Sequence, residues 1–385
     1  MTGSDGAATD SDWGWWRDRR PPAARLHLDT AAAGRSSRAV LAASAAHAER
    51  EAQTGGYVAA AEAEPVLAEG RAALGKLLGV PADGVTFTRS GEGALGALLD
   101  IWPLPEAATI AVAPSEWGPN LDAFAVRGLR LTQIPAAGDG TVDLAALERM
   151  LATEPPAVVH LVQVISHRGL VQPVAAAAAL CRAAGVPLWV DAAQALGHVD
   201  TACGADAVYA TSRKWLTGPR GVGLLGVAEP WWDRLTVRTP QLYRAAQPAG
   251  TSPLRLLAIT EVNVAAWVGL CTAVGEYLET GPPLIWDRLA QAGRQTRETL
   301  ADLPGWAVTD PVDAPSAIVG LRAAAGQDVV AARARLLDEH GIVTTACTVL
   351  RAPLDMAEPL LRISPHVDVT PDDLTRLRQA LLTLT

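Results

Sequence analysis

The sequence predicts an α/β fold built on a largely parallel sheet. Short apolar runs alternate with longer helix-like segments from about residue 85 to residue 228, which is typical of strands joined by crossover helices. This rhythm stops after Pro230, and a chain of 385 residues is long enough for a second domain. We therefore expect a large domain with a seven-stranded sheet, followed by a smaller α+β domain at the carboxyl end.

The elements of the large domain follow from the apolar runs and from the segments between them. Its strands are expected at Val85–Thr88, Thr109–Ala113, Leu129–Ile134, Val158–Val164, Val186–Asp191, Ala207–Ala210 and Gly223–Ala228. Its helices are expected at Gly93–Ile101, Pro119–Gly128, Leu144–Leu151 and Val174–Ala184. Ligands of such sheets bind at the carboxyl ends of the strands, so Asp191 and the turn Thr211–Lys214 are expected at a functional edge.

A different pattern begins after Pro230, where a Trp-, Arg- and Pro-rich stretch precedes one long expected helix, Arg255–Glu279. The remaining elements are expected as helices at Trp286–Ala301 and Val329–His340, and as strands at Ala317–Leu321, Ile342–Thr345 and Leu361–Ile363. Thr370, ahead of a proline and two acids, predicts the cap of a last helix. The predicted organisation is an N-terminal segment (1–24), a large domain (25–254), and a linking helix with the small domain (255–385).

Composition limits the classes of function. The formal net charge of -9 includes no basic cluster, which argues against nucleic-acid binding. No apolar run reaches the length of a membrane span, and the start of the chain lacks the apolar core of a secretory signal. The four cysteines show neither metal-ligand spacing nor a disulfide pattern. We therefore expect a cytoplasmic protein that uses no metal, no nucleic acid and no membrane.

One lysine, Lys214, lies in an apolar setting between Trp215 and the preceding strand. Burial favours the neutral, nucleophilic form of an amine. Asp191 ends another apolar strand, and a carboxylate there could keep a pyridine ring protonated. The two residues together suggest a cofactor with an aldehyde and a ring nitrogen, although a strand-end Asp is more often only a helix cap. Gln194 would then reach the hydroxyl of the same ring.

The loop after Thr88 has the composition of a phosphate-binding turn. It follows a strand and opens a helix, so the amides of Gly91 and Glu92 could hold an anion with the help of the helix dipole. Thr211 and Arg213 would add a hydroxyl and a cation to the same phosphate. An ordinary helix cap is the alternative interpretation of this turn.

These segments resemble the class V aminotransferase branch of the fold-type-I pyridoxal-phosphate enzymes, which includes cysteine desulfurases, selenocysteine lyases and kynureninases. The resemblance spans about residues 25 to 383. It is carried by Leu26–Gly34, Val190–Gln194, the lysine turn through Gly223, and Leu361–His366. It implies pyridoxal 5'-phosphate as the cofactor and a homodimer with shared active sites.

The resemblance also implies a role for each matching residue. Lys214 and Asp191 are the expected catalytic residues. Cofactor binding is expected from Gly91, Glu92, Trp117, His167, Asp191, Gln194, Thr211, Arg213 and Lys214. Substrate binding is expected from Arg362, which suits a carboxylate, and from Ala32, Arg35, Tyr57 and His366.

Several positions depart from the pattern of the desulfurases. Arg213 replaces a histidine before the lysine, and Trp117 lies where a histidine stacks on the cofactor ring. His167 lies where many relatives have an asparagine near the ring hydroxyl. The segment around Thr260, which in relatives contacts the neighbouring subunit's phosphate, matches poorly.

At these same positions the chain resembles a subgroup of the family, the lyases that cleave the carbon–sulfur bond of hercynylcysteine sulfoxide in ergothioneine biosynthesis. The resemblance implies a β-elimination in which Lys214 removes the Cα proton of this amino-acid-derived sulfoxide. An ergothioneine sulfenate then leaves and is converted to ergothioneine in a later step. The rest of the substrate becomes pyruvate and ammonia. Trp117, Tyr57 and Tyr243 are candidates to contact the trimethylammonium group of the substrate.

The alternative interpretation is a cysteine desulfurase or selenocysteine lyase that uses Cys347 as a persulfide carrier. Cys347 precedes Arg362 in about the region where desulfurases have their nucleophile. It ends an apolar strand, however, and the small Gly- or His-rich setting of a desulfurase cysteine is absent.

Overall fold

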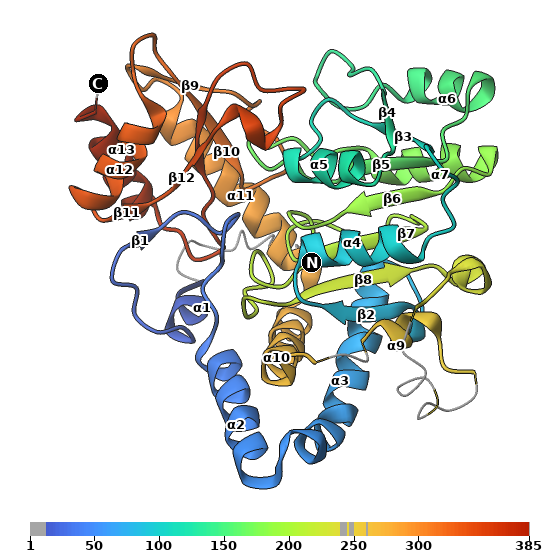
Figure 1. The fold of residues 1–385 in the computed structure, drawn as a ribbon. Coiled ribbons are helices and arrows are strands. Elements are labelled where there is room, and N and C mark those ends of the chain that lie inside the picture. Colours follow the sequence, from blue (N-terminus) through green and yellow to red (C-terminus); the bar gives the residue numbers. More distant parts are fainter. Residues whose placement is uncertain (1–12, 239–244, 246–249, 259–260, 385) are drawn as a thin grey trace, which may run out of the picture.

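A seven-stranded sheet forms the centre of the molecule (Figure 1). The computed structural model describes residues 13–238, 245, 250–258 and 261–384. The strands are β2 (Val85–Thr88), β3 (Thr109–Val112), β4 (Arg130–Gln133), β5 (Val158–Val162), β6 (Leu188–Asp191), β7 (Ala207–Thr211) and β8 (Gly223–Val227). They lie in the order β2-β8-β7-β6-β5-β3-β4, and only β8 runs against the others. The predicted strands and the largely parallel sheet are therefore confirmed.

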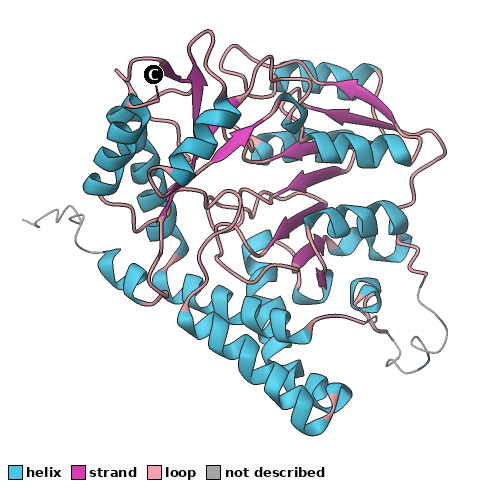
Figure 2. Ribbon diagram, turned by 60° about the vertical axis from the view of Figure 1, so that its left-hand side comes forward, coloured by secondary structure: helices cyan, strands magenta, loops and turns pink. Residues whose placement is uncertain are grey.

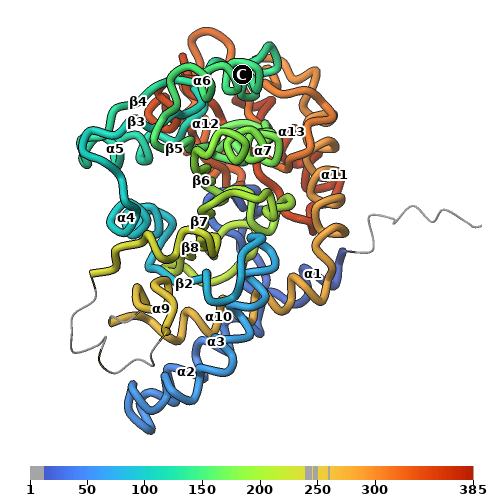
Figure 3. Tube along the Cα trace, turned by 90° about the vertical axis from the view of Figure 1, so that its right-hand side faces the viewer, coloured from blue at the N-terminus to red at the C-terminus, as the bar shows by residue number. Residues whose placement is uncertain are grey.

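Both faces of the sheet are covered, because successive strand residues point to opposite sides. Trp189 and Leu225 pack on the face covered by α4 (Gly91–Ile101) and α5 (Gly118–Val126). Val190 and Leu224, one residue away in each strand, join the core on the other face. That face carries α7 (Val174–Ala184) and α6 (Leu144–Thr153), and Figure 3 shows α7 opposite α4. The four helices predicted within this domain are confirmed.

Three helices that the sequence did not place individually extend from the sheet. They are α2 (Arg38–Thr54), α3 (Gly56–Leu78) and α10 (Val264–Thr280). The short α1 (Gly14–Asp18) precedes them. Helices α2 and α3 meet at Gly55, which has a φ of 88° that favours glycine, and α10 packs against both. The α2–α3 junction projects away from the sheet (Figures 1 and 2).

The carboxyl-terminal part is a smaller α+β unit. Its sheet has the order β12-β13-β10-β9. The strands are β9 (Trp306–Val308), β10 (Val319–Ala323), β12 (Thr345–Cys347) and β13 (Leu360–Ile363). Helices α11 (Pro282–Leu300), α12 (Val329–Asp338) and α13 (Pro371–Leu382) contribute to the core around this sheet, and α13 begins with the predicted capping box at Thr370.

Two expectations need correction. The long helix expected over Arg255–Glu279 is instead two helices, α9 (Pro253–Leu257) and α10. The side chain of Asn263 accepts a hydrogen bond from the Ala266 amide and so starts α10 afresh. The strand expected over Ile342–Thr345 is also divided, into β11 (Ile342–Val343) and β12.

The start of the chain is part of the small unit's surroundings. Strand β1 (Leu26–His27) pairs in parallel with β11, and Asp29 forms a bridge with Ser364. The predicted domain boundaries therefore stay predictions, but residues 26–29 lie against the carboxyl-terminal unit. This contact brings the segment Ala31–Gly34 to the edge of the central sheet.

Candidate active site

A cavity of about 450 Å³ opens at the carboxyl ends of the central strands. Its lining combines the turns after β2, β3, β5, β6 and β7 with three segments from outside the central sheet, which contain Ala31 and Ala32, Arg351, and Arg362. The lining residues are Ala31, Ala32, Arg89, Ser90, Gly91, Glu92, Trp117, Val162, Ser166, Asp191, Ala193, Gln194, Tyr209, Thr211, Arg213, Lys214, Arg220, Gly221, Arg351 and Arg362. Ten of the residues predicted from the sequence are thus brought together.

Lys214 lies in the turn after β7 and keeps part of its surface open to the cavity. Burial lowers the pKa of its amine to about 7, although the nearby Asp191 carboxylate opposes this shift. The segment before α2 closes over the turn so tightly that a Cβ on Gly34 would lie 2.3 Å from the Lys214 carbonyl oxygen. Only glycine fits there, so the backbone of the lysine turn is held in place. The arrangement provides a nucleophilic amine near neutral pH.

Asp191 ends β6 on the same side of the cavity. It is buried, and its carboxylate accepts hydrogen bonds from the Asn120 amide at 3.0 Å and from the Ala193 backbone N–H at 2.8 Å. Gln194 follows one turn later. Its amide donates to the carbonyl of Ala31, while its oxygen accepts from the Trp215 indole. The side-chain amide of Gln194 has two hydrogens, and the second can donate to a ligand.

The opposite end of the cavity is suited to a phosphate. The Ser90 hydroxyl caps α4 by accepting the Gly93 N–H at 3.0 Å. The amides of Gly91 and Glu92, in the first turn of this helix, lack acceptors within the helix and are available to an anion. Arg213 donates to the Ala32 carbonyl and adds a cation at the same wall. Burial, followed by repulsion from Arg220, lowers the pKa of Arg213.

The donor set as a whole fits pyridoxal 5'-phosphate. A helix amino terminus and Arg213 would hold the phosphate, the Lys214 amine would bind the aldehyde, and the Asp191 carboxylate would pair with the ring nitrogen. Asp191, Gln194 and Lys214 come from consecutive turns at one sheet edge, which is where the sequence predicted them.

Two arginines lie at the remaining wall. Arg362, on β13, is almost fully buried; it donates to the Ser166 carbonyl at 2.8 Å and pairs with Asp29 at 3.1 Å. Arg351 reaches the cavity from a short 3-10 turn, Val349–Arg351, and burial lowers its pKa. Among the described residues, the Nε atoms of Arg351 and Arg362 are buried without a hydrogen-bond partner. Both guanidinium groups can therefore receive an anionic group of a ligand.

Three further residues of this site, Arg351, Asn120 and Ser166, were not among those predicted from the sequence. A cation eleven positions before Arg362 was visible, but nothing in the sequence indicated that its turn folds back over α5. Asn120 occupies the third residue of α5 and would have required the register of that helix.

His167 does not line the cavity. Its ring is buried and bonds the Asp355 carboxylate at 2.9 Å, and burial lowers its pKa despite that neighbour. Ser166, one residue earlier, occupies the cavity wall. The contact of His167 with the ring hydroxyl stays a prediction, without support from this geometry.

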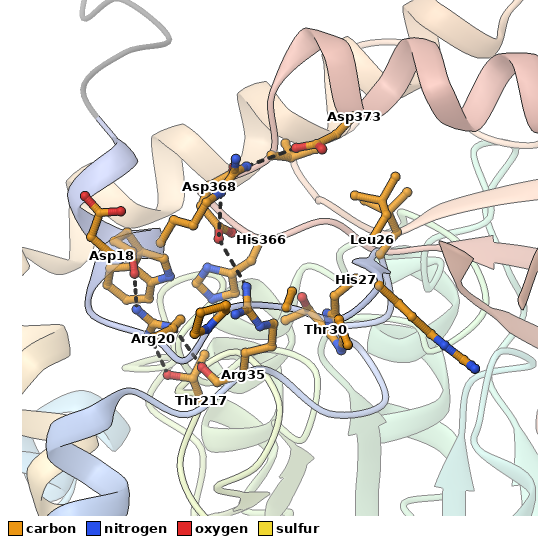
Figure 4. A pocket seen from close by; sticks show the side chains of 18 of the residues that line it. Asp18, Arg20, Leu26, His27, Thr30, Arg35, Thr217, His366, Asp368 and Asp373 are labelled. Carbon is orange, nitrogen blue, oxygen red and sulfur yellow. Dashed lines mark hydrogen bonds and ion pairs between the residues drawn. The ribbon is translucent and has the colours of Figure 1, made fainter. Parts of the chain in front are cut away.

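Arg35 and His366 line a second cavity of about 500 Å³ instead (Figure 4). The two cavities share no lining residue. The His366 ring stacks on Trp16, with 5.1 Å between ring centroids, and burial lowers its pKa to about 3. Arg35 donates to the Pro21 carbonyl and lies 4.0 Å from Asp368. Neither residue lines the Lys214 cavity, so their substrate contacts stay predictions.

Tyr57 lies at the start of α3 and is 98% exposed. It does not line the cavity of its own chain. Tyr243 and Thr260 lie outside the described residues.

No cluster of side chains that could hold a metal ion occurs within the described part of the chain. None of the helices described is long and apolar enough to cross a membrane.

Comparison with known proteins agrees with this geometry. The profile of the family Aminotransferase class-V matches residues 26–377. A protein of Mycobacterium tuberculosis described as a probable hercynylcysteine sulfoxide lyase is 49% identical over 387 aligned positions, which cover 100% of this chain and 96% of the relative.

Solved structures of low sequence identity share the fold. A cysteine desulfurase of Thermococcus onnurineus has a TM-score of 0.82 at 19% identity, covering 94% of each chain. A cystine carbon–sulfur lyase in complex with cysteine persulfide has a TM-score of 0.83 at 18% identity, covering 94% of this chain and 98% of the other. These likenesses establish the fold-type-I architecture predicted above.

Proposed function

The chain belongs to the class V aminotransferase family and is a pyridoxal-phosphate-dependent carbon–sulfur lyase, and from this premise we propose that it cleaves hercynylcysteine sulfoxide by β-elimination. Identity to the mycobacterial relative along the whole chain supports this substrate. The observation in the cavity that carries the proposal is the pair Arg351 and Arg362, which provides for two carboxylates.

The cofactor and the protein contribute different parts of this reaction. Pyridoxal phosphate, when bound, supplies an electron sink for the negative charge that develops at Cα of the substrate. Lys214, whose amine loses its proton near pH 7, takes the Cα proton. The Cβ–S bond breaks, and its electron pair leaves with the sulfur as a sulfenate. The three-carbon fragment is hydrolysed to pyruvate and ammonia, and a separate reductant converts the sulfenate to ergothioneine.

Asp191 and the helix amino terminus hold the cofactor during these steps. The Asp191 carboxylate is fixed by two hydrogen bonds, so it would pair with the ring nitrogen without changing its position. The amides of Gly91 and Glu92, with Arg213 and Thr211, hold the phosphate.

The two arginines separate this substrate from cysteine. Cysteine has one carboxylate, and Arg362 alone can bind it through its Nε, which has no partner in the described structure. Hercynylcysteine sulfoxide has a second carboxylate in its betaine part. Arg351, whose Nε has no partner in the described structure, gives that group a cation inside the cavity.

The desulfurase alternative needs an accessible thiol at Cys347. That side chain is 0% exposed and packs in an apolar cluster with Ala352, Met356 and Leu360. A persulfide carrier must reach the substrate sulfur and then an acceptor, so burial of this kind favours simple elimination.

We also propose that the enzyme is a homodimer that acts in the cytoplasm. Tyr57 and the neighbouring Val58 are large apolar side chains that are more than half exposed at the start of α3, beside the α2–α3 junction. A partner subunit would cover them. All four cysteines are free and buried, in keeping with a reducing compartment.

Product analysis tests the proposal. The enzyme with pyridoxal phosphate is incubated separately with hercynylcysteine sulfoxide and with cysteine, and pyruvate, sulfide and alanine are measured. We expect pyruvate from the sulfoxide, and full retention of that activity in Cys347→Ser. Sulfide with alanine from cysteine, abolished by Cys347→Ser, would instead establish the desulfurase.

A substrate pair tests the role of Arg351. Arg351→Gln is compared with the parent enzyme on hercynylcysteine sulfoxide and on an S-imidazolyl cysteine sulfoxide that lacks the betaine carboxylate. We expect kcat/KM to fall about tenfold or more on the first substrate only, since one charge-assisted hydrogen bond is lost. Equal losses on both substrates would place Arg351 at the shared carboxylate or at the cofactor.

A further inference from the structure

A closed group of buried polar side chains lies directly beneath Asp191. It contains Glu116 and Asn120 near the start of α5, His160 on β5 and Tyr209 on β7. Each of these side chains is at most 1% exposed. Asp191 and Tyr209 are register partners on β6 and β7, so three neighbouring strands present polar groups to the face beneath α5.

The hydrogen bonds run from one carboxylate to the other. The Asn120 amide donates both to Asp191, at 3.0 Å, and to Glu116, at 2.8 Å. The second oxygen of Glu116 lies 2.8 Å from Nδ1 of His160. Nε2 of His160 lies 2.9 Å from the Tyr209 hydroxyl, which in turn interacts with Asp191. These contacts form a closed ring that starts at Asp191, passes through Asn120, Glu116, His160 and Tyr209, and ends at Asp191 again.

Glu116 and His160 are shut off from water, so a charge on either side chain needs a partner of opposite sign. Two carboxylates alone in such a site would repel each other, and one of them would take up a proton. Within this group, His160 is the one side chain that can carry a positive charge beside Glu116; the remaining ring packed on it, that of Phe124, is uncharged. With a proton on each nitrogen, His160 can donate to both Glu116 and Tyr209.

The direction in which the pKa of His160 is shifted agrees with a positive charge on its ring. Burial alone would lower the pKa of His160, but the Glu116 carboxylate, and after it Asp191, raise it above its ordinary value. The Tyr209 hydroxyl stays protonated, because burial and the two carboxylates raise its pKa. It can therefore accept from His160 and donate to Asp191.

Glu116 also orients a second contact to the cofactor. One of its oxygens accepts the backbone N–H of Trp117 at 3.0 Å, and Trp117 lines the cavity as the cap residue of α5. The same carboxylate therefore ties the predicted stacking ring to the network under Asp191.

We propose that Glu116 and His160 form a buried ion pair that acts as a positioning pair for the cofactor, leaving Asp191 as the single uncompensated negative charge beneath the ring nitrogen. The inference rests on the proposed role of Asp191. The pair touches neither cofactor nor substrate; it acts through Asp191, Asn120 and Trp117.

Nitrogen NMR of the holoenzyme tests the charge of His160. Protein labelled with nitrogen-15 in histidine is titrated, and Tyr209→Phe, which removes one hydroxyl, identifies the His160 signals by their shift. We expect both ring nitrogens to carry protons at pH 8, well above the ordinary histidine pKa of about 6.5. A neutral His160 ring at pH 7 would overturn the proposal.

Three variants test the balance of charge. His160→Asn keeps a donor toward Glu116 but removes the cation, Glu116→Gln removes the anion, and the double variant removes both. We expect each single variant to bind pyridoxal phosphate about tenfold more weakly and to shift the pH midpoint of the bound cofactor's visible absorbance. The double variant, which again leaves Asp191 as the one charge, should bind more tightly than His160→Asn.

Two results would contradict the ion pair. Unchanged affinity and absorbance in the single variants would deny any influence on Asp191. A double variant that binds no better than His160→Asn would indicate a packing role alone. If the parent protein bound no pyridoxal phosphate, the proposed function would fail, whereas the charge of His160 would still be measurable in the cofactor-free protein.

Discussion

At the scale of single residues, chemistry depends on how the protein changes the ordinary properties of a side chain. Lys214 is the clearest case, because burial brings the pKa of its amine to about 7 while a carboxylate and several arginines lie nearby. The sequence predicted this lysine from its apolar neighbours. It could not predict the value of the pKa, which depends on Arg213, Arg351 and Arg362 from three separate segments.

The lowered pKa of Lys214 predicts how the cofactor-free protein reacts with pyridoxal phosphate. Only the neutral amine is nucleophilic, so the rate of cofactor capture should rise with pH and level off above about pH 7. An ordinary lysine, with a pKa of about 10.4, would give a rate that is still rising at pH 9. Stopped-flow absorbance between pH 5.5 and 9.5 measures this profile, and a rise without a plateau would show that Lys214 is not buried as described.

At the scale of elements, periodicity was sufficient for the central strands and their helices. The strands β5 to β8 are apolar runs whose two faces are both buried, and α7 matches its expected bounds. Prediction failed where a local polar contact overrides an apolar pattern. Asn263 interrupts the expected helix over Arg255–Glu279 by capping α10, and β1 is too short to be recognised without its partner β11.

The amino terminus of α4 leads to a prediction about one element. Ser90→Ala removes a helix cap and should lower the free energy of unfolding by about 1 kcal/mol. Asp143→Ala, which removes the cap of α6 far from the cavity, is the matched control with a similar expected loss. Pyridoxal phosphate should bind more weakly only to Ser90→Ala, because only α4 faces the phosphate. Urea denaturation and cofactor titration measure the two effects, and equal affinities would remove α4 from the phosphate site.

At the scale of the whole molecule, the cavity joins segments that are far apart in the chain. The sequence placed Asp191, Gln194 and Lys214 correctly at one edge because parallel strands end together. It assigned Arg35 and His366 to the same site, but both line the second cavity, where Nε2 of His366 lies 3.2 Å from the Trp215 carbonyl. Arg351 and the pair of Glu116 and His160 could not be predicted, since they meet the site only through tertiary contacts.

The exposed surface near the α2–α3 junction predicts an oligomer. We expect sedimentation equilibrium to give twice the chain mass of 40.1 kDa. Tyr57→Asp should weaken the dimer, because it places a charge on a surface that a partner would bury. Ser90→Ala, measured at the same protein concentration, is the control variant and should keep the mass of a dimer. A monomeric parent protein with full activity would contradict both the dimer and a shared active site.

The assignment of Lys214 as the residue that binds the cofactor can be tested directly, because Lys76 is the only other lysine of the chain. The protein is incubated with pyridoxal phosphate, reduced with borohydride, digested and analysed by mass spectrometry, with Lys76→Arg as the control. The account predicts one phosphopyridoxyl group, on Lys214, in both the parent and the control, and none in Lys214→Ala. Modification of Lys76 with Lys214 unmodified, or an unmodified parent protein, would contradict it.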